Sequence, residues 1–123
     1  GKMWVMGGRS GAEQQFKFLN DVWSSTDGVV WQNVIPTNNV WTPRMRFGYV
    51  VFNQKLWILG GVAMSAGEEI VTNAIYSSSN GVEWDEVRAN GDSCTGFVCL
   101  DDSGDANNMW AARHSMVVLA YSG

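Results

Sequence analysis

The sequence KMWVMGG at residues 2–8 recurs as KLWILGG at residues 55–61, 53 residues later, and this pair decides the fold. A second pair keeps the same spacing, because NDVWSSTDGVVW at residues 20–31 recurs as NAIYSSSNGVEW at residues 73–84. Differences between the copies conserve side-chain volume, for example Trp replaced by Tyr and Val by Ile. Self-similarity at a period near 50 residues predicts an array of like structural units.

A third pair of segments has a longer spacing. WTPRMRFGYVVFNQ at residues 41–54 aligns without gaps onto WAARHSMVVLAYSG at residues 110–123, which is 69 residues later. The second repeat therefore carries additional residues, and we expect an insertion around residues 90–108. The predicted repeats span residues 2–54 and 55–123.

The composition predicts a globular chain of short strands. Hydrophobic residues make up 46% and charged residues 16%, the opposite of a disordered segment. Seven Trp and fourteen Gly suit many strands joined by tight turns, and no stretch has the spacing of an amphipathic helix. We therefore expect an all-β fold.

Each repeat is predicted to contain four strands. The dipeptides Asp27-Gly28 and Asn80-Gly81 suit the positive backbone angles of a tight turn between the third and fourth strands. The Gly-Gly pairs are expected at crowded strand ends where a side chain would clash. In the second repeat the four strands are predicted at residues 47–52, 55–59, 74–78 and 82–87.

The repeated motifs resemble the kelch family. The resemblance covers nearly the whole chain apart from the insertion, and it rests on a Gly-Gly pair, a Trp after the hairpin turn and an Arg before the first strand. It implies a kelch-like β-propeller, with two four-stranded blades per chain in a ring around a central channel. The signature residues outside the Arg positions are Gly7, Gly8, Gly60, Gly61, Trp31, Trp84, Trp41 and Trp110.

The order of the predicted strands implies assembly. The chain opens on a second strand at Lys2 and closes on a first strand at residues 116–122. Rings have about four to eight blades, so two blades cannot close one. We expect residues 116–122 to complete the blade that starts at Lys2 of a neighbouring copy, which closes a ring head to tail. A homotrimer with six blades is favoured, a homotetramer with eight is the alternative, and a fragment of a longer propeller is the other explanation.

Three arginines and one histidine are the candidate ligand contacts. Arg44 and Arg113 hold matched positions and are able to line an entrance for an anion. The kelch resemblance instead implies that this Arg is a signature residue of the repeat that bonds loop carbonyls, and that is the preferred interpretation. Arg46 and His114 have no counterpart of their own type and are better candidates for a specific contact. The seven Trp are able to stack on sugars, but their recurrence at matched positions favours packing between repeats.

Cys94 and Cys99 are the two cysteines, and both lie in the insertion. A local disulfide is predicted, with free thiols as the alternative. If oxidised, the pair indicates an extracellular or periplasmic location; otherwise the sequence leaves the compartment open. Zinc is disfavoured because two further ligands are not at suitable spacing, and we predict no metal and no cofactor.

Several function classes are disfavoured by charge and composition. A net charge of −4 and a pI near 4.7 disfavour nucleic acid as a partner. The sequence has no run of about 18 apolar residues, so it predicts no membrane span. One His and three Tyr do not reproduce the copper site of the galactose-oxidase branch of kelch-like propellers, and no sialidase constellation is present. We therefore expect a protein that is not an enzyme.

The predicted function is a non-enzymatic binding or scaffold module that assembles into a ring. Its protein or carbohydrate ligand is expected on the face that carries the long loops. One alternative is a carbohydrate-binding or carbohydrate-active propeller with a site at the ring axis. Another is an engineered or evolutionary-model propeller without a ligand, since fold alone transfers no function. The long loops are predicted at residues 9–18, 35–46, 62–71 and 88–114.

Overall fold

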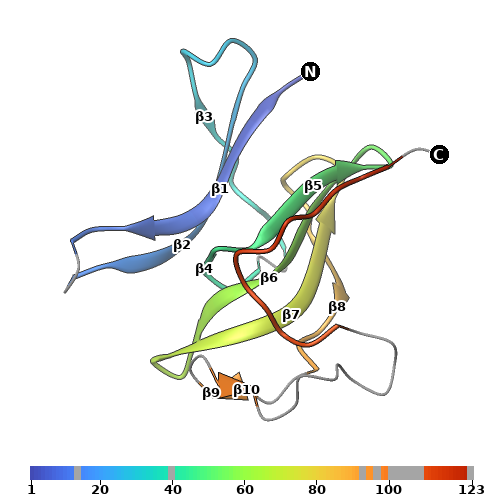
Figure 1. The fold of residues 1–123 in the computed structure, drawn as a ribbon. Coiled ribbons are helices and arrows are strands. Elements are labelled where there is room, and N and C mark those ends of the chain that lie inside the picture. The colour runs from blue at the N-terminus through green and yellow to red at the C-terminus, as the bar shows by residue number, and fades with distance from the viewer. Residues whose placement is uncertain (13–14, 39–40, 92–93, 96–97, 100–109, 122–123) are drawn as a thin grey trace.

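The computed structural model describes residues 1–12, 15–38, 41–91, 94–95, 98–99 and 110–121. These residues form strands, turns and irregular segments, with no helix among them, which confirms the predicted all-β class (Figure 1). Two larger antiparallel sheets and one small two-stranded ladder account for all the strands of the described residues.

The first sheet has the strand order β1-β2-β3, and in the second sheet β4 and β5 both pair with β6, which is followed by β7 and β8. The first sheet contains β1 (Met3–Ser10), β2 (Lys17–Ser25) and β3 (Gln32–Asn33). The second contains β4 (Arg44–Met45), β5 (Gly48–Phe52), β6 (Lys55–Ser65), β7 (Glu68–Ser78) and β8 (Asp85–Arg88). The small ladder consists of β9 (Cys94–Thr95) and β10 (Val98–Cys99).

The β1–β2 ladder of the first sheet and the β6–β7 ladder of the second sheet repeat each other. Val5 lies opposite Trp23 in the first sheet, and Ile58 lies opposite Tyr76 in the second, so the register repeats with the sequence. Both ladders shift register at the Gly-Gly pair. The repeat found in the sequence is therefore a repeat of strand pairing as well.

The Gly-Gly pairs lie inside strands, so the prediction that they end strands is wrong. Gly60 and Gly61 have φ of 60° and 100°, a left-handed conformation that favours glycine, and the ladder resumes after them as at a β-bulge. Crowding is present, because a Cβ at Gly60 would lie 2.8 Å from the carbonyl oxygen of Arg113.

Two of the predicted long loops are instead hairpins. The β6–β7 ladder continues to Ser65 opposite Glu68, and the β1–β2 ladder continues to Ser10 opposite Lys17. In the second sheet, burial of Val62 favours continued pairing. Figure 1 shows both hairpins pointing to the same side of the molecule, with the end of hairpin β6–β7 near the β9–β10 ladder.

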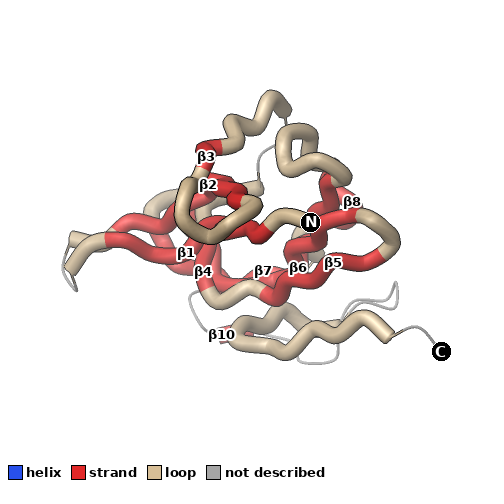
Figure 2. Tube along the Cα trace, turned by 90° about the horizontal axis from the view of Figure 1, so that it is seen from above, coloured by secondary structure: helices blue, strands red, loops and turns tan. Residues whose placement is uncertain are grey.

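Residues 116–121 do not form a strand in this structure, although a strand was predicted over residues 116–122. A strand needs a backbone partner, and no ladder includes these residues. They run along the second sheet, on the side opposite to the first sheet (Figure 2).

The core lies where the two sheets meet. Its buried side chains come from both repeats and centre on two tryptophans whose rings meet edge to face, 6.0 Å apart. Partly buried side chains of β1 and of residues 34 and 47 pack around it. The buried core residues are Val22, Trp41, Leu56, Ile58, Ala74, Tyr76 and Trp84.

Candidate functional site

The turn that follows β2 is held by side-chain acceptors. The Ser25 hydroxyl oxygen accepts the Gly28 N–H at 2.8 Å, and Oδ1 of Asp27 accepts the N–H groups of Val29 and Val30 at 2.8 and 2.9 Å. The turn after β7 has the same three bonds at the same distances, made by Ser78, Asn80, Gly81, Val82 and Glu83.

Only the glycine of each turn has a positive φ, 78° at Gly28 and 76° at Gly81. The prediction of two residues with positive angles is therefore wrong at Asp27 and Asn80, whose side chains instead accept backbone N–H groups. These bonds favour the ionised carboxylate, so the backbone N–H groups of Val30 and Val29 and the Ser25 hydroxyl lower the pKa of Asp27.

The tryptophans after these turns have equal hydrogen bonds and unequal burial. Trp84 donates its indole N–H to the Gly81 carbonyl at 2.9 Å, and Trp31 donates to the Gly28 carbonyl at 3.1 Å. Trp84 is 0% exposed because Trp41 covers it, whereas Trp31 is only half-buried. The burial of each tryptophan therefore depends on residues outside its own turn.

Arg44, in β4, is buried against β6 and β7. Its side chain is 1% exposed and donates to the Gly60 carbonyl at 3.0 Å, to the Thr42 carbonyl at 3.1 Å and to the Thr42 hydroxyl at 2.8 Å. The guanidinium also lies 5.1 Å from the centre of the Tyr76 ring. Burial lowers the pKa of Arg44 and raises the pKa of Tyr76, whose hydroxyl donates to Glu86 at 3.1 Å. Arg44 therefore joins parts of one sheet and is not presented to an anion.

Arg113 is exposed, in contrast to its counterpart. Its Nε donates to the Ala111 carbonyl at 3.0 Å, as Nε of Arg44 does to the Thr42 carbonyl. The backbone carbonyl of Arg113 accepts the Gly61 N–H at 2.9 Å. The structure thus fixes the backbone of this segment on the second sheet and leaves the guanidinium at the surface.

The other two candidate side chains are Arg46 and His114. Arg46 is exposed and lines a groove with Phe47 and Tyr49, whereas Arg113 lines a different groove. His114 is half-buried, with Nδ1 3.1 Å from the hydroxyl of Ser115. The described residues therefore do not bring the four candidate side chains together around one cavity.

The segments that leave the two sheets are held in the same way. The Asn20 side chain in β2 donates to the Trp41 carbonyl at 3.3 Å, and the Asn73 side chain in β7 donates to the Trp110 carbonyl at 3.1 Å. The first segment leads into β5, and the second leads into residues 116–121. The bond that holds the connection from the first sheet to the second therefore has a counterpart where the chain leaves the second sheet and runs along its outer face.

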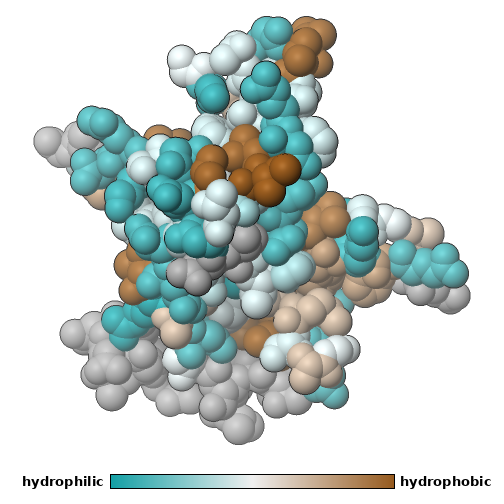
Figure 3. Space-filling model, turned by 180° about the vertical axis from the view of Figure 1, so that it is seen from behind, coloured by the Kyte–Doolittle hydropathy of each residue, from teal (hydrophilic) through white to brown (hydrophobic). Residues whose placement is uncertain are grey.

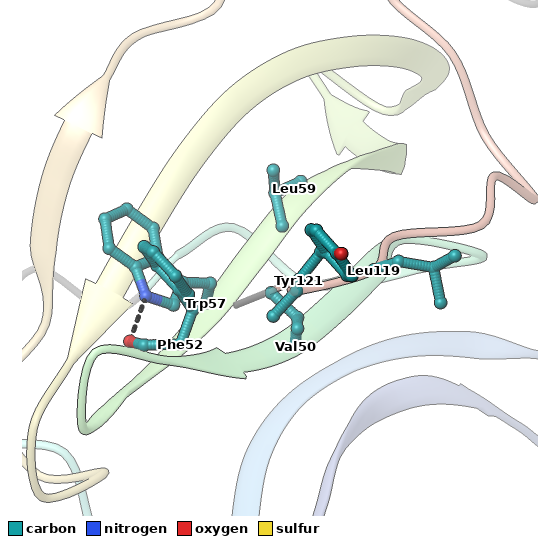
Figure 4. A pocket seen from close by; sticks show the side chains of 7 residues that line it. Val50, Phe52, Trp57, Leu59, Leu119 and Tyr121 are labelled. Carbon is teal, nitrogen blue, oxygen red and sulfur yellow. Dashed lines mark hydrogen bonds between the residues drawn. The ribbon is translucent and has the colours of Figure 1, made fainter. Parts of the chain in front are cut away.

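Residues 116–121 and the second sheet enclose an apolar groove of about 400 Å³. Figure 4 shows Trp57 donating its indole N–H to the Phe52 carbonyl, with Tyr121 nearby. Leu119 and Tyr121 are 85% and 87% exposed. The lining residues are Val50, Phe52, Trp57, Leu59, Leu119, Ala120 and Tyr121.

At the other side of the chain, β1 has an open edge. Among the described residues β1 pairs with β2 alone, whereas its counterpart β6 pairs with β7 and with β4 and β5. Met3 and Val5 are 46% and 51% exposed along this strand. Figure 3 shows apolar side chains at the surface on the face seen from behind. An exposed apolar strand edge is a place where another strand is able to pair.

The cysteine prediction lies mostly outside the described residues, as does most of the predicted insertion. The backbone register places Cys99 opposite Cys94 in the β9–β10 ladder, and the structure describes neither side chain. In the part of the chain that is described, no three His, Cys, Asp or Glu side chains gather as a metal site would require, and no helix is present to cross a membrane.

Sequence reasoning missed the groove at Trp57 and Tyr121 as a surface. The continuous apolar run at residues 116–121 is the sequence signal that an apolar surface lies there. A comparison with models of known protein families found no match, and a comparison with curated proteins found none either.

Proposed function

We propose that this chain is a non-enzymatic binding scaffold, a kelch-like β-propeller unit that assembles head to tail into a closed ring. One observation carries the proposal: the segment at Trp41, which connects the first sheet to the second, has a counterpart at Trp110 that leaves the second sheet with the same Asn side-chain bond. A fixed step repeated between like units generates a ring when the rotation closes. A homotrimer with six blades is favoured, and a homotetramer is the alternative.

The exposed apolar surfaces support assembly. Residues 117, 119 and 121 at one side and Met3 and Val5 at the other are strongly exposed. Contiguous apolar surface of this kind is unusual on a monomer and marks an interaction site. Pairing of the two surfaces would remove both from water and would complete the edge of β1.

Light scattering after size exclusion tests the proposal, because a single chain has a mass of 13.5 kDa. We expect about three times this mass for the homotrimer. Val5→Lys should reduce the mass to that of one chain, because a charge at the β1 edge opposes pairing. Val87→Lys in β8 is the matched control, since both valines are 51% exposed. A mass of one chain for the unsubstituted protein would overturn the proposal.

We propose that the ligand surface of the scaffold lies at the ends of hairpins β1–β2 and β6–β7, which point to the same side of the molecule (Figure 1). Function on repeat scaffolds concentrates in such connections, which a rigid sheet positions. A protein or carbohydrate ligand fits this surface.

A carbohydrate-binding function has one observation in its favour. The groove in Figure 4 presents Phe52, Trp57 and Tyr121, and aromatic faces suit sugar rings. A glycan panel tests this alternative: saturable binding that Tyr121→Ala abolishes without a change in mass would favour it. Absence of binding leaves the scaffold, with or without a protein ligand.

A further inference from the structure

We infer that a second copy of this chain docks on β1 and β2 through its residues 110–121, using contacts like those that Trp41, Arg44 and Trp4 already make with the second sheet within one chain. The inference rests on the proposed function and adds the residues that specify the contact. It takes these contacts within one chain as the template, because the residues of each contact have counterparts at the sequence spacing of the repeats.

The template has three principal contacts. The Trp41 ring meets the Trp84 ring edge to face at 6.0 Å. Arg44 bonds the Gly60 carbonyl and lies over the ring of Tyr76. Trp4 lies against Gly81, where a Cβ would come within 2.5 Å of the indole. The corresponding pairs between copies are Trp110 with Trp31, Arg113 with Trp23 and the Gly7 carbonyl, and Trp57 with Gly28.

The partial exposure of these counterparts is what we expect of side chains that a second copy covers. Trp31, Trp110, Trp23 and Trp57 are each half-buried, whereas Trp84 and Trp41 are completely buried in the template. The local hydrogen bond of Trp31 is already formed, so docking requires no rearrangement of its turn. A second copy would supply the cover that the turn lacks.

The first sheet carries an aromatic ring beside a carboxylate, and this pair suits the guanidinium of Arg113. In the template, the carboxylate of Glu86 accepts the hydroxyl proton of Tyr76, which lies beside the Arg44 guanidinium. In the first sheet, the carboxylate of Asp21 accepts the indole N–H of Trp23 at 2.8 Å. An aromatic face next to a carboxylate is thus present at both positions, and Trp is the strongest of the aromatic partners for a cation.

The register of the docked strand follows from the ladder between β5 and β6. Tyr49 lies opposite Ile58, and Val51 lies opposite Leu56. The same register between copies puts Val118 opposite Val5 and Ala120 opposite Met3. Residues 116–121 would then become a strand, because β1 supplies the backbone partner that they lack within one chain.

A disulfide cross-link tests the register. The double variant Ala120→Cys with Met3→Cys should form reducible oligomers under mild oxidation, since directly opposite residues lie about 4.5–5.5 Å apart at Cβ. Ala120→Cys with Val5→Cys is the control, because two residues along a strand add about 7 Å. The unsubstituted chain under the same oxidant gives the baseline for its two native cysteines.

A second measurement tests the Arg113 contact by light scattering over a dilution series. Arg113→Ala should raise the concentration at which the assembly dissociates by about tenfold or more, the effect of losing a desolvated cation–π contact. Arg46→Ala is the matched control: it also removes an exposed arginine, but position 46 has Ser115 as its counterpart and contributes no repeated contact.

The outcomes separate this inference from the proposed function. Oligomers that cross-link equally through the Val5→Cys control, or that tolerate Arg113→Ala as well as Arg46→Ala, would overturn the docking register and leave the ring in place. A mass of one chain at every concentration would overturn both. Cross-linking confined to the Met3→Cys pair, with dissociation specific to Arg113→Ala, would support it.

Discussion

The turns at residues 25–31 and 78–84 have the same hydrogen bonds and different surroundings. In each, a Ser hydroxyl and an Asp or Asn oxygen accept the backbone N–H groups, and a Trp indole closes the turn on a Gly carbonyl. Trp84 is nevertheless completely buried and Trp31 is not. The comparison shows that nearby residues specify the shape of the turn, whereas the adjoining sheet determines how much the turn contributes to stability.

The largest expected effect comes from the two tryptophans. Trp84→Ala should lower the free energy of unfolding by about 3–5 kcal/mol, as for a large side chain removed from a core. For Trp31→Ala the loss should depend on protein concentration, because in the proposed ring another copy covers Trp31. Urea unfolding at two concentrations at least tenfold apart measures both. Equal, concentration-independent losses would contradict the comparison.

Arg44 and Arg113 extend the comparison to a charged side chain. Arg44→Met should cost about 1.5–3 kcal/mol, because the Gly60 carbonyl loses a charged donor in a buried site. Arg113→Met should leave the unfolding free energy of a single chain nearly unchanged, since its guanidinium is at the surface. Urea unfolding at low protein concentration distinguishes them, and a loss at Arg113 as large as that at Arg44 would count against this prediction.

The glycines of the two turns give a smaller difference. Ala at either position must adopt a positive φ, which costs about 1–2 kcal/mol. In a single chain, Gly81→Ala should cost about 1 kcal/mol more than Gly28→Ala, because the new Cβ overlaps the Trp4 ring. Thermal unfolding of the two variants side by side, at a protein concentration low enough to dissociate the proposed ring, tests this, and a greater loss for Gly28→Ala would refute it.

The smallest effect concerns pH. The pKa of Asp27 is lowered in the folded state, so its stabilising contribution is present above the ordinary value of 3.8 and is lost as the pH falls through the lowered value. Asp27→Asn should remove this dependence, because Asn80 makes the same bonds without titrating. Unfolding midpoints between pH 2.5 and 6 provide the measurement, with Asp85→Asn as the exposed control.

Repetition in the sequence predicted the all-β class and the pairing of like segments. The register shared by Trp23 with Val5 and by Tyr76 with Ile58 repeats because the alternation of side chains repeats. The role of the Gly-Gly pair was not predictable in the same way. A glycine pair suits a strand end or a bulge equally, and the ladder beyond it depends on tertiary burial of the residues that follow, such as Val62.

The candidate site was only partly accessible from the sequence. Arg44 and Arg113 hold equivalent sequence positions, so no local pattern distinguishes the buried guanidinium from the exposed one. What separates them is the presence of a sheet around Arg44, a tertiary property. The edge of β1 was expected from strand order, whereas the groove at Trp57 emerges only when residues 116–121 are placed against the second sheet.

The otherwise matched turns each carry one carboxylate, but at different places. Asp27 accepts backbone N–H groups in the first turn, whereas the second turn has Asn80 there and carries the exposed Glu83 at the position of Val30. In the proposed ring these turns alternate around the circumference, so the two carboxylate positions follow each other. The backbone of such a ring would have nearly one symmetry-related position per blade, while its electrostatic field would repeat only once per chain. A cationic ligand that recognises one of the two carboxylate positions would therefore encounter half as many equivalent places as a ligand that contacts the backbone alone.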